Sequence, residues 1–177
     1  MMLNTAKMTN SVEVILEDSR WAQSELDTLA LGAFDIVLRD IGLAGGWHVN
    51  VLACDDAKIQ QLNADHRRKD AATNVLSWPN EELAPEAPGG VPDLPTVNVF
   101  GENELGDIAV SFETCRKEAQ AKGISMRDHV THLLIHGYLH LLGYDHETDA
   151  DATLMEGKEI LLLETLGISD PYREDKP

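Results

Sequence analysis

The sequence predicts an α+β fold in which a single domain, residues 1–177, contains a small mixed β-sheet packed with helices. Three observations lead to this prediction. The chain of 177 residues has the length of one domain and shows no internal repeat. Short strand-like runs are interspersed with longer helical segments. Three histidines between residues 136 and 146 have the spacing of a metal site built on a helix and the turn after it.

The first part of the chain reads as a strand, a helix and a second strand. Residues 12–16 alternate as a strand, and residues 20–38 have helical periodicity. Gly45 and Gly46 end this unit, and the second strand runs over residues 47–54. Asp55 and Asp56 are N-cap candidates for the helix that follows. The core contacts expected of the first helix are Trp21, Leu26, Leu29, Phe34 and Val37.

Two further strands are predicted at residues 74–78 and 108–111. Between them, residues 80–104 are acidic and proline-rich, contain Gly89-Gly90 and lack lysine and arginine. Such a composition is typical of a mobile insertion, and we expect no regular structure there.

Three helices are predicted in the last third of the chain. The first covers residues 112–122, with Ser111 as its cap and Gly123 as its end, and the second covers residues 126–142. The third covers residues 149–166, contributes only packing and ends at Gly167, before a flexible tail at residues 168–177. Its expected core residues are Leu154, Met155, Leu161, Leu162 and Leu166, and those of the second helix are Leu133, Leu134, Leu139 and Leu141.

The histidine cluster is the most informative feature of the chain. His136 and His140 are four residues apart, so they lie one turn apart on one helix face and can bind one metal ion. Gly143 can adopt a left-handed conformation that ends the helix, which lets His146 approach as a third ligand. Three nitrogen ligands leave one tetrahedral position open, as in catalytic zinc sites. We therefore expect one Zn²⁺ per chain, held by these histidines.

The spacing is similar to that of the metzincin metalloproteases, whose histidines and glycine stand at the same offsets. In those proteases a glutamate base follows the first histidine, whereas this chain has Gly137 there. The ligand pattern is thus present without the protease's base. His129 and His132 extend the same helical stripe, but no chain reversal brings a third ligand to them. We interpret both as packed histidines or as supports of the metal ligands.

The pattern HGxLHLxGYDH at residues 136–146 resembles the signature of the YbeY family, bacterial zinc-dependent endoribonucleases of ribosomal RNA maturation. Two further blocks resemble that family, LNxxxRxKDxxTNVLSWP at residues 62–79 and LGDIAVS at residues 105–111, as does the helix around Met155 and Glu159. The resemblance spans roughly residues 45 to 167. It implies that Arg67 is the catalytic arginine.

Four positions depart from the family pattern. His66 stands where a tyrosine is expected, Arg68 where glycine is usual, Asn74 where aspartate is usual and Trp78 where phenylalanine is usual. Arg68 adds a charge and Asn74 removes one, so these changes bear on substrate contacts and leave the metal site intact.

Composition restricts the environment of the protein. Cys54 and Cys115 form no C-x-x-C pair, so we expect reduced, buried thiols and a cytoplasmic location. Residues 1–10 lack the apolar run of a signal peptide, and no stretch approaches the roughly 18 apolar residues of a membrane span. We therefore expect no membrane partner.

The net charge of −17 is unusual for a protein that binds RNA. The basic residues are local: one strip contains Lys58 and residues 67–69, and a second group flanks the metal helix at Arg116, Lys117, Lys122 and Arg127. We expect this small positive strip to guide a single strand to the metal while the acidic exterior limits indiscriminate binding.

Together these features lead to one functional hypothesis and two alternatives. The hypothesis is a zinc-dependent, single-strand-specific endoribonuclease of ribosomal RNA maturation and ribosome quality control, with a ribosomal particle or ribosome-associated protein as partner. Arg67 would neutralise charge on the phosphate in the transition state. Asp145 would either orient a metal ligand or cap the turn. The alternatives are a metal-dependent peptide or amide hydrolase and a non-catalytic ribosome-associated module with a structural zinc, for which His132 or Asp145 would be the fourth ligand.

Overall fold

A four-stranded mixed sheet forms the centre of the computed structural model, which describes residues 8–97 and 100–173. Its strands are β1 (Ser11–Leu16), β2 (His48–Cys54), β3 (Val75–Pro79) and β4 (Glu104–Ser111), in the spatial order β1-β2-β4-β3. The β1–β2 and β2–β4 pairs are parallel, and β3 lies antiparallel to β4 at one edge. The small mixed sheet of the predicted α+β fold is confirmed.

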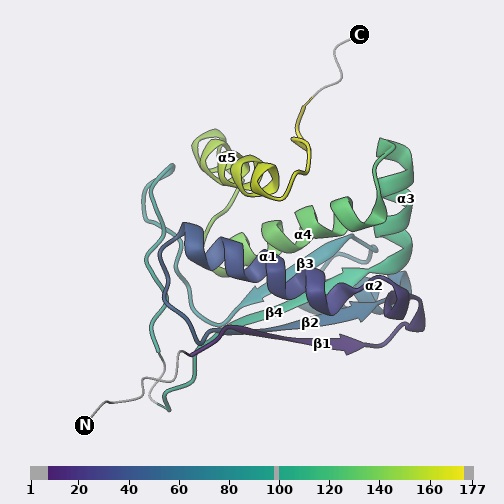
Figure 1. The fold of residues 1–177 in the computed structure, drawn as a ribbon, viewed down its shortest axis with the longest axis horizontal. Coiled ribbons are helices and arrows are strands. Elements are labelled where there is room, and N and C mark those ends of the chain that lie inside the picture. Colours follow the sequence, from purple (N-terminus) through teal and green to yellow (C-terminus); the bar gives the residue numbers. More distant parts are fainter. Residues whose placement is uncertain (1–7, 98–99, 174–177) are drawn as a thin grey trace.

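One face of the sheet is covered by α1 (Leu26–Asp40) and α4 (Met126–Leu141), which lie side by side (Figure 1). Above them in Figure 1, α5 (Asp149–Thr165) forms an outer layer. Alternate residues of β2 point to this side, and Val49, Val51 and Ala53 are fully buried in the main core. All four leucines predicted to pack from α4 are buried there.

The opposite face of the sheet is covered by α2 (Asp56–Arg67). Ile59 of this helix packs with Cys54, Leu76 and Ala109 in a second, smaller core. Cys54 and Cys115 are both buried and unpaired, as predicted. Burial raises the pKa of the Cys54 thiol to about 12, so this thiol stays protonated near neutral pH.

The N-termini of α2 and α3 (Phe112–Lys122) cap one another. Asp55 is the N-cap of α2 and accepts a hydrogen bond from the backbone N–H of Lys58. Ser111 occupies the N-cap position of α3, yet its hydroxyl donates to Asp56 instead of accepting from the helix. The carboxylate of Asp56 accepts the backbone N–H of Thr114 in its place. The prediction that Ser111 itself caps α3 was therefore wrong, because a stronger acceptor from the neighbouring helix performs that task.

The predicted helix 20–38 is interrupted. A 3-10 turn over Ser19–Gln23 comes first, and α1 begins only after Glu25, whose φ of 53° is left-handed. Trp21 holds this turn in place, since its buried indole N–H donates to the carbonyl of Cys54 at 2.9 Å. Tertiary anchoring of one aromatic side chain thus outweighs the helical periodicity of the segment.

The segment between β3 and β4 has no helix or strand in the part that the structure describes, and β4 starts earlier than predicted, at Glu104. It is held at several points. Leu83 is buried, Thr96 donates to Glu81, and the backbone N–H of Gly89 donates to Asp151 of α5. The expected mobility of this insertion stays a prediction.

The C-terminal residues 168–173 lie against α5. The remainder of the predicted flexible tail, residues 174–177, lies outside the described residues. Residues 1–7 of the N-terminal segment lie outside them as well. None of the helices in the described ranges is long and apolar enough for a membrane span.

Candidate metal centre

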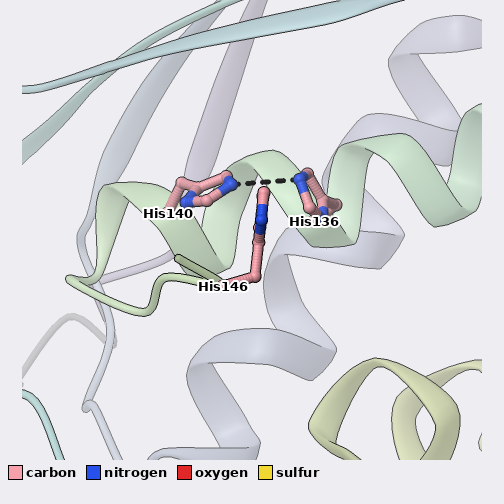
Figure 2. Close-up of side chains that lie close together, drawn as sticks. All are labelled: His136, His140 and His146. Atoms are coloured by element: carbon pink, nitrogen blue, oxygen red, sulfur yellow. Dashed lines mark hydrogen bonds between the residues drawn. The ribbon is translucent and has the colours of Figure 1, made fainter. Parts of the chain in front are cut away.

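The three predicted ligands converge at the end of α4. His136 and His140 stand on its last turns, and His146 returns from the turn that follows, so that the three rings face one another (Figure 2). One ligand atom of each lies within 4.8 Å of the others. His136 and His140 are partly buried, whereas His146 is exposed. The arrangement expected from the spacing is present, and its geometry is compatible with a metal ion.

Gly143 makes the chain reversal possible in two ways. Its φ is +92°, a conformation that L side chains rarely adopt. A Cβ at this position would also lie only 2.7 Å from the carbonyl carbon of Leu83, which belongs to the insertion. The turn that carries His146 is therefore packed directly against the insertion backbone.

The decisive observation concerns the protons on two of the rings. His140 Nδ1 is 2.9 Å from the carbonyl oxygen of Tyr144, which can only accept, so this nitrogen carries the proton. His136 Nδ1 lies 2.6 Å from a carboxylate oxygen of Glu159 and must likewise donate. With both Nδ1 atoms acting as donors, the two Nε2 atoms face each other and stand 3.0 Å apart, within hydrogen-bond distance (Figure 2). This contact needs a cation between the two nitrogens, which is either a proton that one ring donates to the other or a bound metal ion.

The electrostatics of His140 favour the same form. Burial lowers the pKa of His140 to about 4, and repulsion from His136 and His146 acts in the same direction. Near neutral pH the ring is therefore uncharged, which is the form in which imidazole binds metals. His140 therefore offers a neutral nitrogen donor to a cation.

Glu159 of α5 was missed by the sequence analysis, which assigned only packing to that helix. Its side chain is fully buried and contacts His132 at 2.9 Å and His136 at 2.6 Å. Burial alone would raise the pKa of this carboxyl, but the hydrogen bonds from the two histidines outweigh burial and lower the pKa to about 2. A signal was available, because Glu159 shares the buried stripe of α5 with Met155, Leu162 and Leu163, where a carboxylate is rare unless paired. Leu161 and Leu166, predicted to pack, are exposed instead.

The remaining polar residues near the trio have other partners. His129 is buried and bonds to Glu118 at 2.7 Å, and His132 bonds to Glu159, so both are packed histidines outside the trio, as predicted. Asp145 accepts the backbone N–H of His146 at 2.7 Å. Of the two roles considered for Asp145, this contact favours capping the turn.

Gly137, which stands where the metzincin proteases have their glutamate base, packs closely against the sheet. A Cβ on Gly137 would lie 2.9 Å from Cδ1 of Ile108 and 3.2 Å from the hydroxyl of Ser77. Both neighbours belong to strands under α4. A glutamate after the first histidine would therefore have to displace the side chains of Ile108 and Ser77, so the close packing of helix and sheet favours glycine there.

Arg67 is the last residue of α2, which covers the face of the sheet opposite to α4. Its side chain is exposed, and no hydrogen bond or ion pair joins it to another residue in the ranges that the structure describes. The structure therefore does not bring Arg67 into contact with the histidine trio. Its catalytic role stays a prediction.

The departures from the family pattern have local explanations. Arg68 is the C-cap of α2 with a φ of 56°, a left-handed position at which glycine is unstrained. His66 and Trp78 contact each other edge to face at 5.5 Å between ring centroids, so the two exchanged rings pack together. Asn74 donates its amide to the carboxylate of Glu118, where an aspartate would be repelled.

Comparison with known proteins agrees with these motifs. The family described as Endoribonuclease YbeY matches residues 11–167. The chain belongs to the YbeY family. A relative named Endoribonuclease YbeY from Ruegeria pomeroyi is 52% identical over 163 residues, which are 92% of this chain and 98% of the relative. Another of that name, from Ruegeria sp. (strain TM1040), is 51% identical over 94% of this chain and 99% of its own.

The fold of the YbeY chain is also similar to a solved structure. The solution structure of TM1509 from Thermotoga maritima superposes with a TM-score of 0.57 at 25% sequence identity, covering 92% of this chain and 99% of that one. The resemblance stated from the sequence is confirmed over nearly the whole length of the chain.

Proposed function

We propose that this chain is a zinc-dependent endoribonuclease that cleaves single-stranded RNA. The observation that supports it most strongly is the convergence of His136, His140 and His146, whose ligand atoms all lie within 4.8 Å of one another. Relatives at about 50% identity that are named Endoribonuclease YbeY support the RNA substrate. A zinc ion held by these three histidines would supply Lewis-acid chemistry and would lower the pKa of a bound water toward neutrality.

The donor set fits a catalytic zinc better than a structural one. Structural sites are closed by four protein ligands, whereas catalytic sites have three. His132 and Asp145, the two candidates for a fourth ligand, are engaged with Glu159 and with the backbone of His146. Within the described residues, the trio therefore has no fourth protein ligand, which argues against the non-catalytic zinc module.

A peptide or amide hydrolase with the same ligand spacing is disfavoured by Gly137. Metzincins activate their attacking water with the glutamate at this position. Here that position is Gly137, which supplies no carboxylate. A base for peptide hydrolysis would have to come from elsewhere in the chain.

Arg67 is proposed to neutralise negative charge on the scissile phosphate. Its resemblance to the family's arginine motif is the first support, and its exposed side chain with no ion-pair partner among the described residues is the second. A guanidinium that is not already paired can form two parallel hydrogen bonds to phosphate oxygens. Arg68 and Lys69, also exposed, add positive charge beside it.

The natural substrate is proposed to be ribosomal RNA presented by a ribosomal particle or a ribosome-associated protein in the cytoplasm, where the chain would act in ribosomal RNA maturation and ribosome quality control. Few basic residues are available for bare RNA. Arg127 is 3.8 Å from Glu25, and Lys58 is 4.0 Å from Glu17, so both already face acids. With a net charge of −17, a small number of phosphate contacts gives weak binding to free RNA. Unpaired buried cysteines suit a reducing compartment.

The experiment is cleavage of a defined single-stranded RNA, free and within ribosomal subunits, by the zinc-loaded wild type and by His140→Ala. We expect cleavage by the wild type, faster on the particle, and loss of cleavage in the variant. His48→Ala serves as the control, because it removes a histidine of β2 that lies outside both the trio and the Arg67 segment. Equal cleavage by the wild type and His140→Ala would contradict the proposal, and cleavage of casein instead of RNA would revive the peptide hydrolase.

A further inference from the structure

Glu159 is the only fully buried carboxylate among the described residues, and it lies outside the histidine trio. One of its oxygens accepts from His136 Nδ1 at 2.6 Å. The other accepts from His132 Nε2 at 2.9 Å and from the hydroxyl of Tyr172. No lysine or arginine of the described ranges forms an ion pair with it. A buried negative charge without a cationic partner is costly, so it needs another source of compensation.

His136 belongs to two groups of potential ligands at once. Its Nε2 faces His140 in the trio, and its Nδ1 faces Glu159 in a group that also contains His132. Contacts of 2.6 and 2.9 Å between nitrogen and oxygen are the lengths of charge-assisted hydrogen bonds. Ligand atoms around a tetrahedral zinc with bonds of about 2.0–2.1 Å stand roughly 3.4 Å apart, so a proton fits these contacts better than a second ion.

We propose that Glu159 is a positioning residue for the metal ligand His136. By accepting the Nδ1 proton, Glu159 fixes the tautomer and the orientation of the ring, so that the Nε2 lone pair faces the site of the ion. The negative charge of Glu159 makes the His136 ring a better donor to a cation at Nε2. That cation in turn compensates the buried charge of Glu159. This inference rests on the proposed metal site of the trio and assigns to α5 a role in metal affinity.

His132 and Tyr172 hold the carboxylate in its place. His132 is on α4 one turn before His136, and Tyr172 comes from the segment after α5. The two donors occupy the oxygen that does not face His136, which leaves the other oxygen for the Nδ1 proton. The buried histidine therefore acts on the metal site through Glu159 and does not bind the ion itself.

The test is the Zn²⁺ affinity of the full chain, measured by competition with a chromophoric chelator, together with the visible spectrum of the Co²⁺-loaded protein. Glu159→Leu removes every acceptor at nearly constant volume, and Glu159→Gln keeps one acceptor but removes the charge. Glu118→Leu and Glu118→Gln are the matched controls, because Glu118 makes the same kind of contact, at 2.7 Å, to His129 of the same helix. Thermal unfolding of each metal-free variant reports stability separately.

We expect Zn²⁺ affinity to fall about 10- to 100-fold in Glu159→Leu, the usual effect of losing such a partner, and by less in Glu159→Gln. The Co²⁺ spectrum should change in both, and the Glu118 variants should match the wild type. Wild-type affinity in a folded Glu159→Leu would overturn the inference, as would an equal loss in the Glu118 variants. If Glu159→Leu does not fold, wild-type affinity in Glu159→Gln has the same meaning. Absence of Zn²⁺ and Co²⁺ binding in the wild type would instead refute the proposed metal-dependent function.

Discussion

Gly143→Ala tests whether the turn after α4 sets the geometry of the metal site. Gly143 has a φ of +92°, and an added Cβ would meet the Leu83 carbonyl carbon at 2.7 Å and its oxygen at 2.8 Å. Gly167→Ala is the control, because Gly167 also has a positive φ, +73°, but no atom lies within 4 Å of its Cβ position. The two variants share the backbone strain and differ in the clash.

The magnitudes follow from these two terms. A left-handed alanine costs about 1–2 kcal/mol, of which about 0.4–1 kcal/mol is recovered through the reduced entropy of the unfolded chain. Gly167→Ala should therefore lose roughly 1 kcal/mol of unfolding free energy. The contact with Leu83 adds the cost of overpacking, about 1–3 kcal/mol, so Gly143→Ala should lose roughly 2–4 kcal/mol.

The same steric clash should also weaken zinc binding. Relief of a 2.7 Å contact requires the turn to move by several tenths of an ångström, whereas metal–ligand distances tolerate only about 0.2 Å. Zinc binding would pull the displaced turn back into the strained position. If this costs about 1.4 kcal/mol of binding free energy, the Zn²⁺ affinity falls about tenfold. Urea unfolding of the metal-free protein and chelator competition measure the two effects. Equal destabilisation by both substitutions, or unchanged Zn²⁺ affinity in Gly143→Ala, would refute this reasoning.

Three further outcomes are expected. Arg67→Ala should slow RNA cleavage about 10²- to 10³-fold with normal zinc content, and Arg67→Lys should restore little of the rate. Single-turnover cleavage rates measure this effect. Full activity in Arg67→Ala would show that another residue neutralises the phosphate charge. Arg68→Gly relieves a left-handed arginine and should raise the free energy of unfolding by up to about 1 kcal/mol, seen as a higher urea midpoint, whereas a lower midpoint would argue against strain. The pKa of His140 is about 4 in the fold against 6.5 ordinarily, so unfolding takes up a proton between these values. Metal-free stability should thus fall, by at most about 3 kcal/mol, as pH drops from 6.5 to 4, and His140→Gln should flatten that slope.

The convergence of the three histidines was predictable because its determinants are local. A spacing of four on one helix and a glycine three residues later suffice to bring His136, His140 and His146 together, and the structure has that arrangement. The strands of the mixed sheet were likewise visible as short alternating runs, with errors of a few residues at their ends.

The features that escaped prediction depend on contacts between distant segments. Glu159 acquires its role only when α5 packs on α4, 23 residues from its partner His136. Asp56 caps α3 across 58 residues of sequence, so the local Ser111 signal was misleading. Trp21 breaks a helical pattern because its indole bonds to the carbonyl of Cys54 on β2. Local sequence patterns do not contain information about such contacts between distant segments.

The most direct test of the metal centre is the zinc content of the purified chain and of three variants, His136→Ala, His140→Ala and His146→Ala, with His129→Ala as a buried histidine of the same helix outside the trio. We predict about one zinc per chain in the wild type and in His129→Ala, and a sharp loss in each of the three trio variants. Stoichiometric zinc retained in all three would contradict the assignment of this site.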